Sequence, residues 1–195
     1  IKSWYKSKET WDGKFSSIAS TYEECRAESV GLYLSLDLGV LRQMPLSKSP
    51  KDSHVKIVGM MAIAWHSWGA ARESEEARAA PWLARASASI FVILHVCLST
   101  TGGLVSVEHT VGADGRPDAR ISLDRAKIPT VGRAAIQDFL LKLQVYKSTA
   151  DVDAGRALYA ALSAVNDDTE QRFLALRDTV MLRKEPRKMF VQVNT

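Results

Sequence analysis

The chain has 195 residues, of which 46% are hydrophobic and 25% are charged, a composition typical of a globular protein rather than a disordered one. Its 26 basic residues exceed its 22 acidic residues by four and are scattered along the chain, so nucleic acid is not an expected partner. The longest strongly apolar stretch, Ile90 to Leu98, is interrupted by His95 and falls well short of the ~20 residues of a membrane span, so we expect a soluble protein.

The first predicted helix follows a polar, glycine-containing segment that starts near Thr10. An apolar period of about 3.6 residues begins at Ile18 and places Tyr22, Cys25 and Leu32 on the same side. We therefore predict a helix from about Ser17 to Leu36. The prolines and polar residues at positions 45–53 then predict a loop, because proline denies backbone donors and restricts the residue before it.

The middle of the chain is predicted to be helical up to a pair of glycines. A helix is expected from about Val55 to Ala80, with Pro81 as a break, and a buried helix from Ala84 to Ser99. Gly102 and Gly103 end it. Residues 104–107 and 119–123 then alternate with the two-residue period of strands, and the turn-rich residues 112–118 join them into a hairpin.

Three further helices are predicted after the hairpin, at about Val131–Val145, Asp151–Val165 and Thr169–Glu185. Their inward residues are expected to be Ile136, Phe139, Leu140 and Leu143 in the first, Leu158 and Leu162 in the second, and Phe173, Leu176 and Val180 in the third. Asp151 and one of Asp167 and Asp168 are predicted N-caps. The fold class expected from the whole pattern is mainly α with one small β-hairpin.

Both ends of the chain suggest a fragment. No initiator Met or leader precedes Ile1, and the last residues, 190–195, alternate like a strand without a partner. The two cysteines, Cys25 and Cys97, belong to no paired motif and are expected to be free thiols, which points to the cytoplasm.

Three carboxylates gather in the first helix, within the segment Tyr22-Glu-Glu-Cys-Arg-Ala-Glu-Ser29. Glu24 and Glu28 lie one turn apart, and Glu23 lies about 100° round from Glu24. Like charges at one turn destabilise a helix, so a cation is expected nearby; Arg26 can pair with Glu23 but points away from the other two. By itself the pattern leaves two interpretations open, a solvated acidic face and a metal or catalytic site.

The longer segment from Trp4 to Leu34 closely resembles the dipeptidyl peptidase III family, as do residues 110–128, 143–152 and 176–188. In that family, H-E-x-x-G-H supplies two zinc-binding histidines and a water-activating Glu, and E-E-C-R-A-E/D supplies the third ligand. Here only the second motif is present. The resemblance implies that Glu24 is a zinc ligand, and that Glu23 and Glu28 orient the two histidines that this sequence lacks.

The resemblance also implies a zinc exopeptidase of two lobes that cuts dipeptides from the N-terminus of oligopeptides. Residues 1–186 would belong to the helical, zinc-bearing lobe, and residues 187–195 would start the crossover to the other lobe. Arg187 and Lys188 would contact the bound peptide; a solvated basic helix end is the alternative. Without the rest of the parent enzyme, the chain is expected to lack both a tight zinc site and peptidase activity.

The sequence departs from the family at two positions. The family has a W-x-x-A-H-x-x-A-R-F pattern, but Ala86 replaces its His and Ile90 its Arg. Alanine cannot donate a hydrogen bond to a substrate carbonyl. A catalytically impaired homologue that binds peptides or proteins therefore stays open, as does a truncated helical interaction module. No pair of the four histidines has metal-ligand spacing, and neither a serine nor a cysteine nucleophile motif occurs, so no catalytic residue is assigned.

Overall fold

The computed structural model describes residues 4–34, 36–37, 40 and 91–183, and the structural statements below concern these residues. The elements are, in chain order, α1 (Trp11–Phe15), a 3-10 turn (Ser16–Ile18), α2 (Ala19–Leu34), helical residues 91–98, β1 (Val105–Val111), β2 (Pro117–Leu123), a 3-10 turn (Arg125–Lys127), a π-helical turn (Ile128–Gly132), α7 (Arg133–Ser148), α8 (Val152–Ser163) and α9 (Phe173–Arg183). The expected fold class, mainly helical with one hairpin, is confirmed.

The motif helix α2 buries the face that its sequence predicts. Tyr22, Cys25 and Leu32 are buried, and Ile18 packs against the core from the turn before the helix. The short helix α1 was not predicted; its N-cap is Thr10, whose hydroxyl accepts a hydrogen bond of 3.2 Å from the Gly13 N–H. Five residues are too few to reveal a helical period, which is why the sequence pattern missed it.

The predicted hairpin is present, and its strands extend beyond the alternating segments from which it was predicted. β1 and β2 are antiparallel, with Val105 opposite Leu123 and Val111 opposite Pro117. The tip turns through Gly115, whose φ of +74° favours glycine. The guanidinium of Arg183, at the end of α9, forms a bidentate ion pair with Asp114 at 2.7 and 2.8 Å and so ties that helix to the tip.

The three helices after the hairpin are present, and most of their predicted inward residues are on the buried side. Of the nine residues predicted to face inward, five are buried, namely Ile136, Phe139, Leu143, Phe173 and Leu176, and the other four, Leu140, Leu158, Leu162 and Val180, are partly buried. Asp151 caps α8 by accepting from the Ala154 N–H at 3.2 Å, and Asp167 accepts from the Ala175 N–H in the first turn of α9 at 3.1 Å. The predicted N-cap Asp151 is therefore confirmed. Asp167 bonds to the first turn of α9 but stands six residues before Phe173, so it is not the N-cap residue of that helix.

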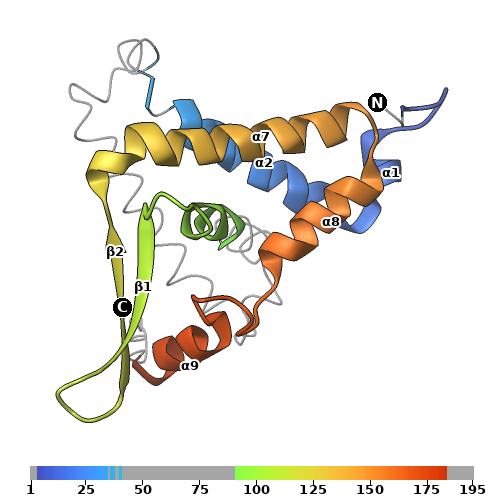
Figure 1. Cartoon of the computed structure of the whole chain (residues 1–195). Helices are drawn as coiled ribbons and strands as arrows, with labels where there is room; N and C mark the ends of the chain where they lie inside the picture. The colour runs from blue at the N-terminus through green and yellow to red at the C-terminus, as the bar shows by residue number, and fades with distance from the viewer. Residues whose placement is uncertain (1–3, 35, 38–39, 41–90, 184–195) are drawn as a thin grey trace, which may run out of the picture.

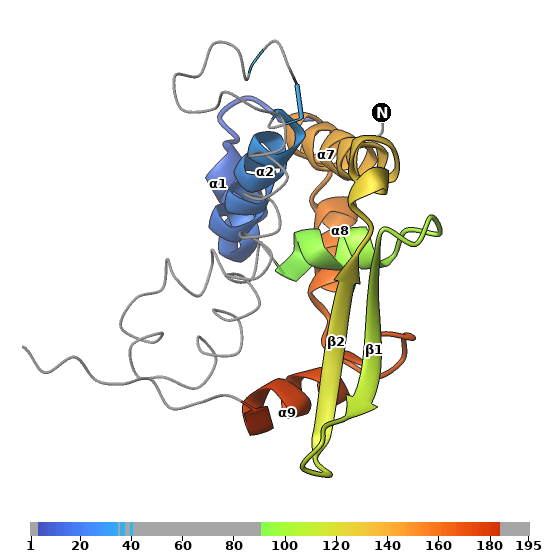
Figure 2. The same ribbon diagram turned by 90° about the vertical axis from the view of Figure 1, so that its left-hand side faces the viewer.

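The helix of residues 91–98 lies in the middle of the described elements, with α2 and α7 side by side on one flank and the hairpin on another (Figure 1, Figure 2). Six of its apolar residues are at most 5% exposed. α9 packs against β2 near the tip of the hairpin. None of the described helices combines the length and apolar character that a membrane crossing requires.

Candidate functional site

Helix α2 is held rigidly by aromatic contacts on its buried face. The Tyr22 hydroxyl donates a buried hydrogen bond of 2.9 Å to the carbonyl oxygen of Leu143 in α7. The Tyr22 ring also lies 5.3 Å from the ring of Phe15, which stacks on Trp11 at 4.0 Å. Because this side of the helix is fixed, the directions of the carboxylates on its other sides are fixed as well.

Glu23 is held by two cations. Arg26 donates to its Oε1 atom from Nε at 3.0 Å and also from Nη2, as its sequence spacing predicts. Lys147, 124 residues away at the end of α7, donates to the Oε2 atom. The hydrogen bond from Arg26, together with that from Lys147, lowers the pKa of Glu23 to about 2. Glu23 is therefore ionised and bonded at both oxygens.

Glu24, the next residue, has a different environment. Its side chain is exposed, and no cation among the described residues pairs with it. Glu28 lies one turn further on and is partly buried; burial, and then the negative charge of Glu24, raise the pKa of Glu28. The like-charge pair expected from the spacing is thus present, and within the described structure it has no counter-ion.

Glu24 opens onto a groove between α1, α2 and the end of α7. The groove is lined by Trp11, Asp12, Ala19, Ser20, Glu23, Glu24, Ala27 and Lys147. The Lys147 ammonium lies 4.9 Å from the centroid of the Trp11 ring, in the range of a cation–π contact. Neither Trp11 nor Lys147 was predicted from the sequence, because no local pattern links residues so far along the chain to Glu23.

The donor chemistry of this site fits zinc in part. An exposed carboxylate such as that of Glu24 is an ordinary zinc ligand, and a structural or catalytic site needs three or four protein ligands. Among the described residues, no three His, Cys, Asp or Glu side chains lie together in a way that could hold a metal ion. The part of the chain that the structure describes therefore offers one ligand and its carboxylate neighbours, and no closed zinc site.

The other residues singled out in the sequence divide into two groups. Arg187, Lys188, Ala86, Ile90, His54 and His66 lie outside the described residues. His95 and His109 are described, and both bond to backbone: His95 Nδ1 lies 2.9 Å from the Leu162 carbonyl oxygen, and His109 Nε2 lies 3.0 Å from that of Gln171. His95 is 8% exposed, so it is the packed core imidazole that its apolar helix predicts.

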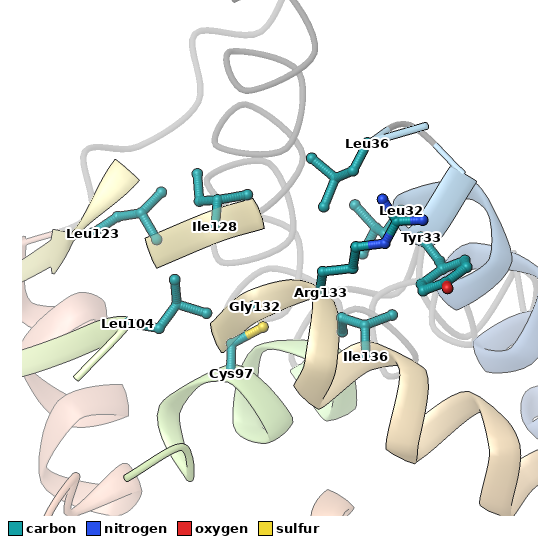
Figure 3. A pocket seen from close by; sticks show the side chains of 10 residues that line it. All are labelled: Leu32, Tyr33, Leu36, Cys97, Leu104, Leu123, Ile128, Gly132, Arg133 and Ile136. Carbon is teal, nitrogen blue, oxygen red and sulfur yellow. The ribbon is translucent and has the colours of Figure 1, made fainter. Parts of the chain in front are cut away.

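A second hollow, at the C-terminal end of α2 and beside the start of α7, is apolar (Figure 3). It is lined by Leu32, Tyr33, Leu36, Cys97, Leu104, Leu123, Ile128, Gly132, Arg133 and Ile136. Its charged member, Arg133, lies over the Tyr33 ring at 4.8 Å. The cavity measures about 30 Å³, and an apolar space of that size stays dry and is too small for a ligand. It is a packing gap in the core.

A mainly helical fold with one hairpin carries the E-E-C-R-A-E segment on α2, and Glu24 of that segment is exposed. The chain belongs to peptidase family M49, whose sequence model matches residues 1–195. The chain is 50% identical to the mouse protein named dipeptidyl peptidase 3, 48% to its human counterpart and 42% to that of Nematostella vectensis. Each alignment covers the whole chain and 26% of the relative, so the chain spans about a quarter of the length of these curated relatives.

Proposed function

We propose that this chain is part of a zinc-dependent exopeptidase that releases dipeptides from the N-terminus of oligopeptides. The observation that carries the proposal is the exposure of Glu24 at the groove, beside a Glu23 whose two oxygens are already bonded. Membership of family M49 and the name of the mouse relative support the same reaction. The longer polypeptide that would contain residues 1–195 together with an H-E-x-x-G-H segment is called the parent protein below.

Glu24 would be the zinc ligand that this chain contributes. Glu23 and Glu28 would not bind the zinc ion themselves but would orient its two histidine ligands. A zinc ion with three protein ligands supplies Lewis acidity at the scissile carbonyl. What the chain itself supplies is a rigid helix: Tyr22 bonds to Leu143 behind Glu24, so the carboxylate is presented without first having to be ordered.

The remaining parts of the proposal concern the substrate and the lobe boundary. Arg187 and Lys188 would contact the oligopeptide from the segment, residues 187–195, that starts the crossover between the two lobes. Residues 1–186 would belong to the zinc-bearing lobe. The proposed location is the cytoplasm, because neither Cys25 nor Cys97 forms a disulfide within the described structure.

The test is the substitution Glu24→Gln in the parent protein, with zinc content measured by metal analysis and turnover measured on a dipeptidyl-arylamide. Gln keeps the shape and removes the charge, so we expect at least a tenfold loss of zinc affinity, which is the smallest effect typical of groups that support a metal site. Glu170→Gln is the matched control, because Glu170 is exposed and far along the chain in the loop before α9. Full zinc content and turnover in Glu24→Gln would refute the proposal.

Residues 1–195 alone are expected to hydrolyse no dipeptidyl-arylamide, with or without added zinc. The sequence contains no H-E-x-x-G-H segment, and one carboxylate cannot hold a catalytic zinc ion. Robust turnover by this chain would overturn the assignment of the two histidines to another segment.

A second function, favoured by Ala86 and Ile90, is binding of peptides without efficient cleavage. A hydrogen-bond donor that stabilises a developing oxyanion is worth about 2.7 to 4 kcal/mol, so losing one would slow turnover by two to three orders of magnitude. This function predicts a parent protein that binds zinc but barely turns over, and predicts that Ala86→His raises turnover. Unchanged turnover in Ala86→His would count against it.

A further inference from the structure

The segment Glu23-Glu24 presents two adjacent carboxylates at the same groove, and only one of them is available to a cation. Both residues line the groove together with Lys147. Glu23 accepts from Arg26 at one oxygen and from Lys147 at the other. Arg26 belongs to α2 itself, so its bond would follow Glu23 wherever that helix turn moved, whereas the bond from Lys147 fixes Glu23 relative to another helix.

Lys147 is itself firmly placed. Its carbonyl oxygen accepts a hydrogen bond of 2.8 Å from the Tyr5 hydroxyl. Its ammonium lies 4.9 Å from the Trp11 ring centroid, and its side chain is 27% exposed. A lysine side chain is usually a mobile group, so the hydrogen bond at its backbone carbonyl and the two interactions of its ammonium, with Glu23 and with the Trp11 ring, mark it as a fixed part of the groove wall.

The position of the ammonium also matters electrostatically. A divalent cation that approached Glu23 would meet the positive charge of Lys147 at hydrogen-bond distance from the same carboxylate, and like charges at that separation repel strongly. Glu24 has no such cation beside it among the described residues. The repulsion therefore directs an incoming cation away from Glu23 and toward Glu24.

We propose that Lys147 is a positioning residue of the metal site: from the last turn of α7 it holds the Glu23 carboxylate and leaves Glu24 as the carboxylate that meets the metal ion. The proposal rests on the function proposed above. It assigns to Lys147 no contact with metal or substrate; the residue acts through Glu23.

The test uses the parent protein with cobalt in place of zinc, because the visible spectrum of Co²⁺ changes with the number and kind of its ligands. Lys147→Met keeps the stem and removes the charge. We expect an altered cobalt spectrum and zinc binding weakened about tenfold, the lower end of the effect of groups that orient metal ligands. We also expect a lower kcat with little change in KM, because the substrate is not touched. Lys147→Arg should restore the spectrum.

Two controls separate positioning from simple stability. Lys142→Met removes another ion pair of α7, the exposed bond of 2.7 Å to Asp138, and should leave the spectrum unchanged. In a Glu23→Gln background, Lys147→Met should have no further effect on the spectrum, because Gln cannot compete for the cation; a general folding defect of Lys147→Met would instead appear in both backgrounds.

The outcomes distinguish this proposal from the one on which it rests. A parent-like cobalt spectrum and zinc affinity in Lys147→Met, or equal effects of Lys147→Met with and without Glu23→Gln, would overturn the role of Lys147 alone. A cobalt spectrum unchanged by Glu24→Gln would overturn both proposals, because Glu24 would then not be a ligand.

Discussion

Gly155, in the first half of α8, is the position at which the packing behind the motif helix can be tested most sharply. A Cβ atom added there would lie 2.8 Å from Cε1 of Phe15 and 3.4 Å from Cε2 of Tyr22. Phe15 is fully buried and stacked on Trp11, so its ring has nowhere to move. The absence of a side chain at Gly155 is thus what lets α8 approach the aromatic cluster that supports α2.

The substitution Gly155→Ala sets two effects against each other. Replacing glycine by alanine inside a helix stabilises it by about 1 kcal/mol, whereas overpacking a well-filled core costs about 1–3 kcal/mol. Because the contact at 2.8 Å is with a ring that cannot shift, we expect the cost to win and the free energy of unfolding to fall by about 1 kcal/mol. Gly31→Ala in α2 is the matched control: no described atom lies within 4 Å of its added Cβ, so that variant should gain roughly 0.5–1 kcal/mol.

The assay is urea unfolding of both variants of the parent protein, followed by tryptophan fluorescence, with the midpoints compared at equal slopes. The free energy of unfolding should fall in Gly155→Ala and rise in Gly31→Ala, so the two variants should differ by about 2 kcal/mol. A Gly155→Ala variant at least as stable as Gly31→Ala would refute the claim that the Phe15 ring is fixed.

Two further predictions concern the same part of the molecule. Asp151→Ala should lower the free energy of unfolding by about 1 kcal/mol, because Asp151 caps α8 by accepting from the Ala154 N–H, whereas Asp151→Asn should keep most of the stability; equal losses in both would contradict the cap. Burial raises the pKa of Cys25 and of Cys97 to about 12, so at pH 8 a thiol reagent should label neither in the folded protein and both in denaturant; rapid labelling of the folded protein would count against their burial.

Regular periodicity explains why much of the fold could be predicted. The buried residues Tyr22, Cys25 and Leu32 recur with the helical period, and the hairpin strands alternate before and after a turn-rich segment. Asp151 stands directly before an apolar period, which is where a cap is required. The predicted ends of the helices were less accurate, since α9 begins at Phe173 rather than near Thr169, because backbone geometry and capping, rather than apolar spacing, decide where a helix stops.

The motif by itself named Glu23, Glu24 and Glu28 as the residues of interest, because their types and spacing are local properties of the chain. Its spacing also predicted that Arg26 pairs with Glu23 and not with Glu24, but it could not reveal the second cation, Lys147. Glu23 is bonded at both oxygens because α7 brings Lys147 against it from 124 residues away, and Glu24 is exposed because the next position on a helix points about 100° round. The sequence determined which side chains the motif helix carries. Only tertiary packing decided that Lys147 pairs with Glu23 and that Glu24 stays exposed, because an ion pair requires proximity in space, and the order of residues along the chain does not specify that proximity.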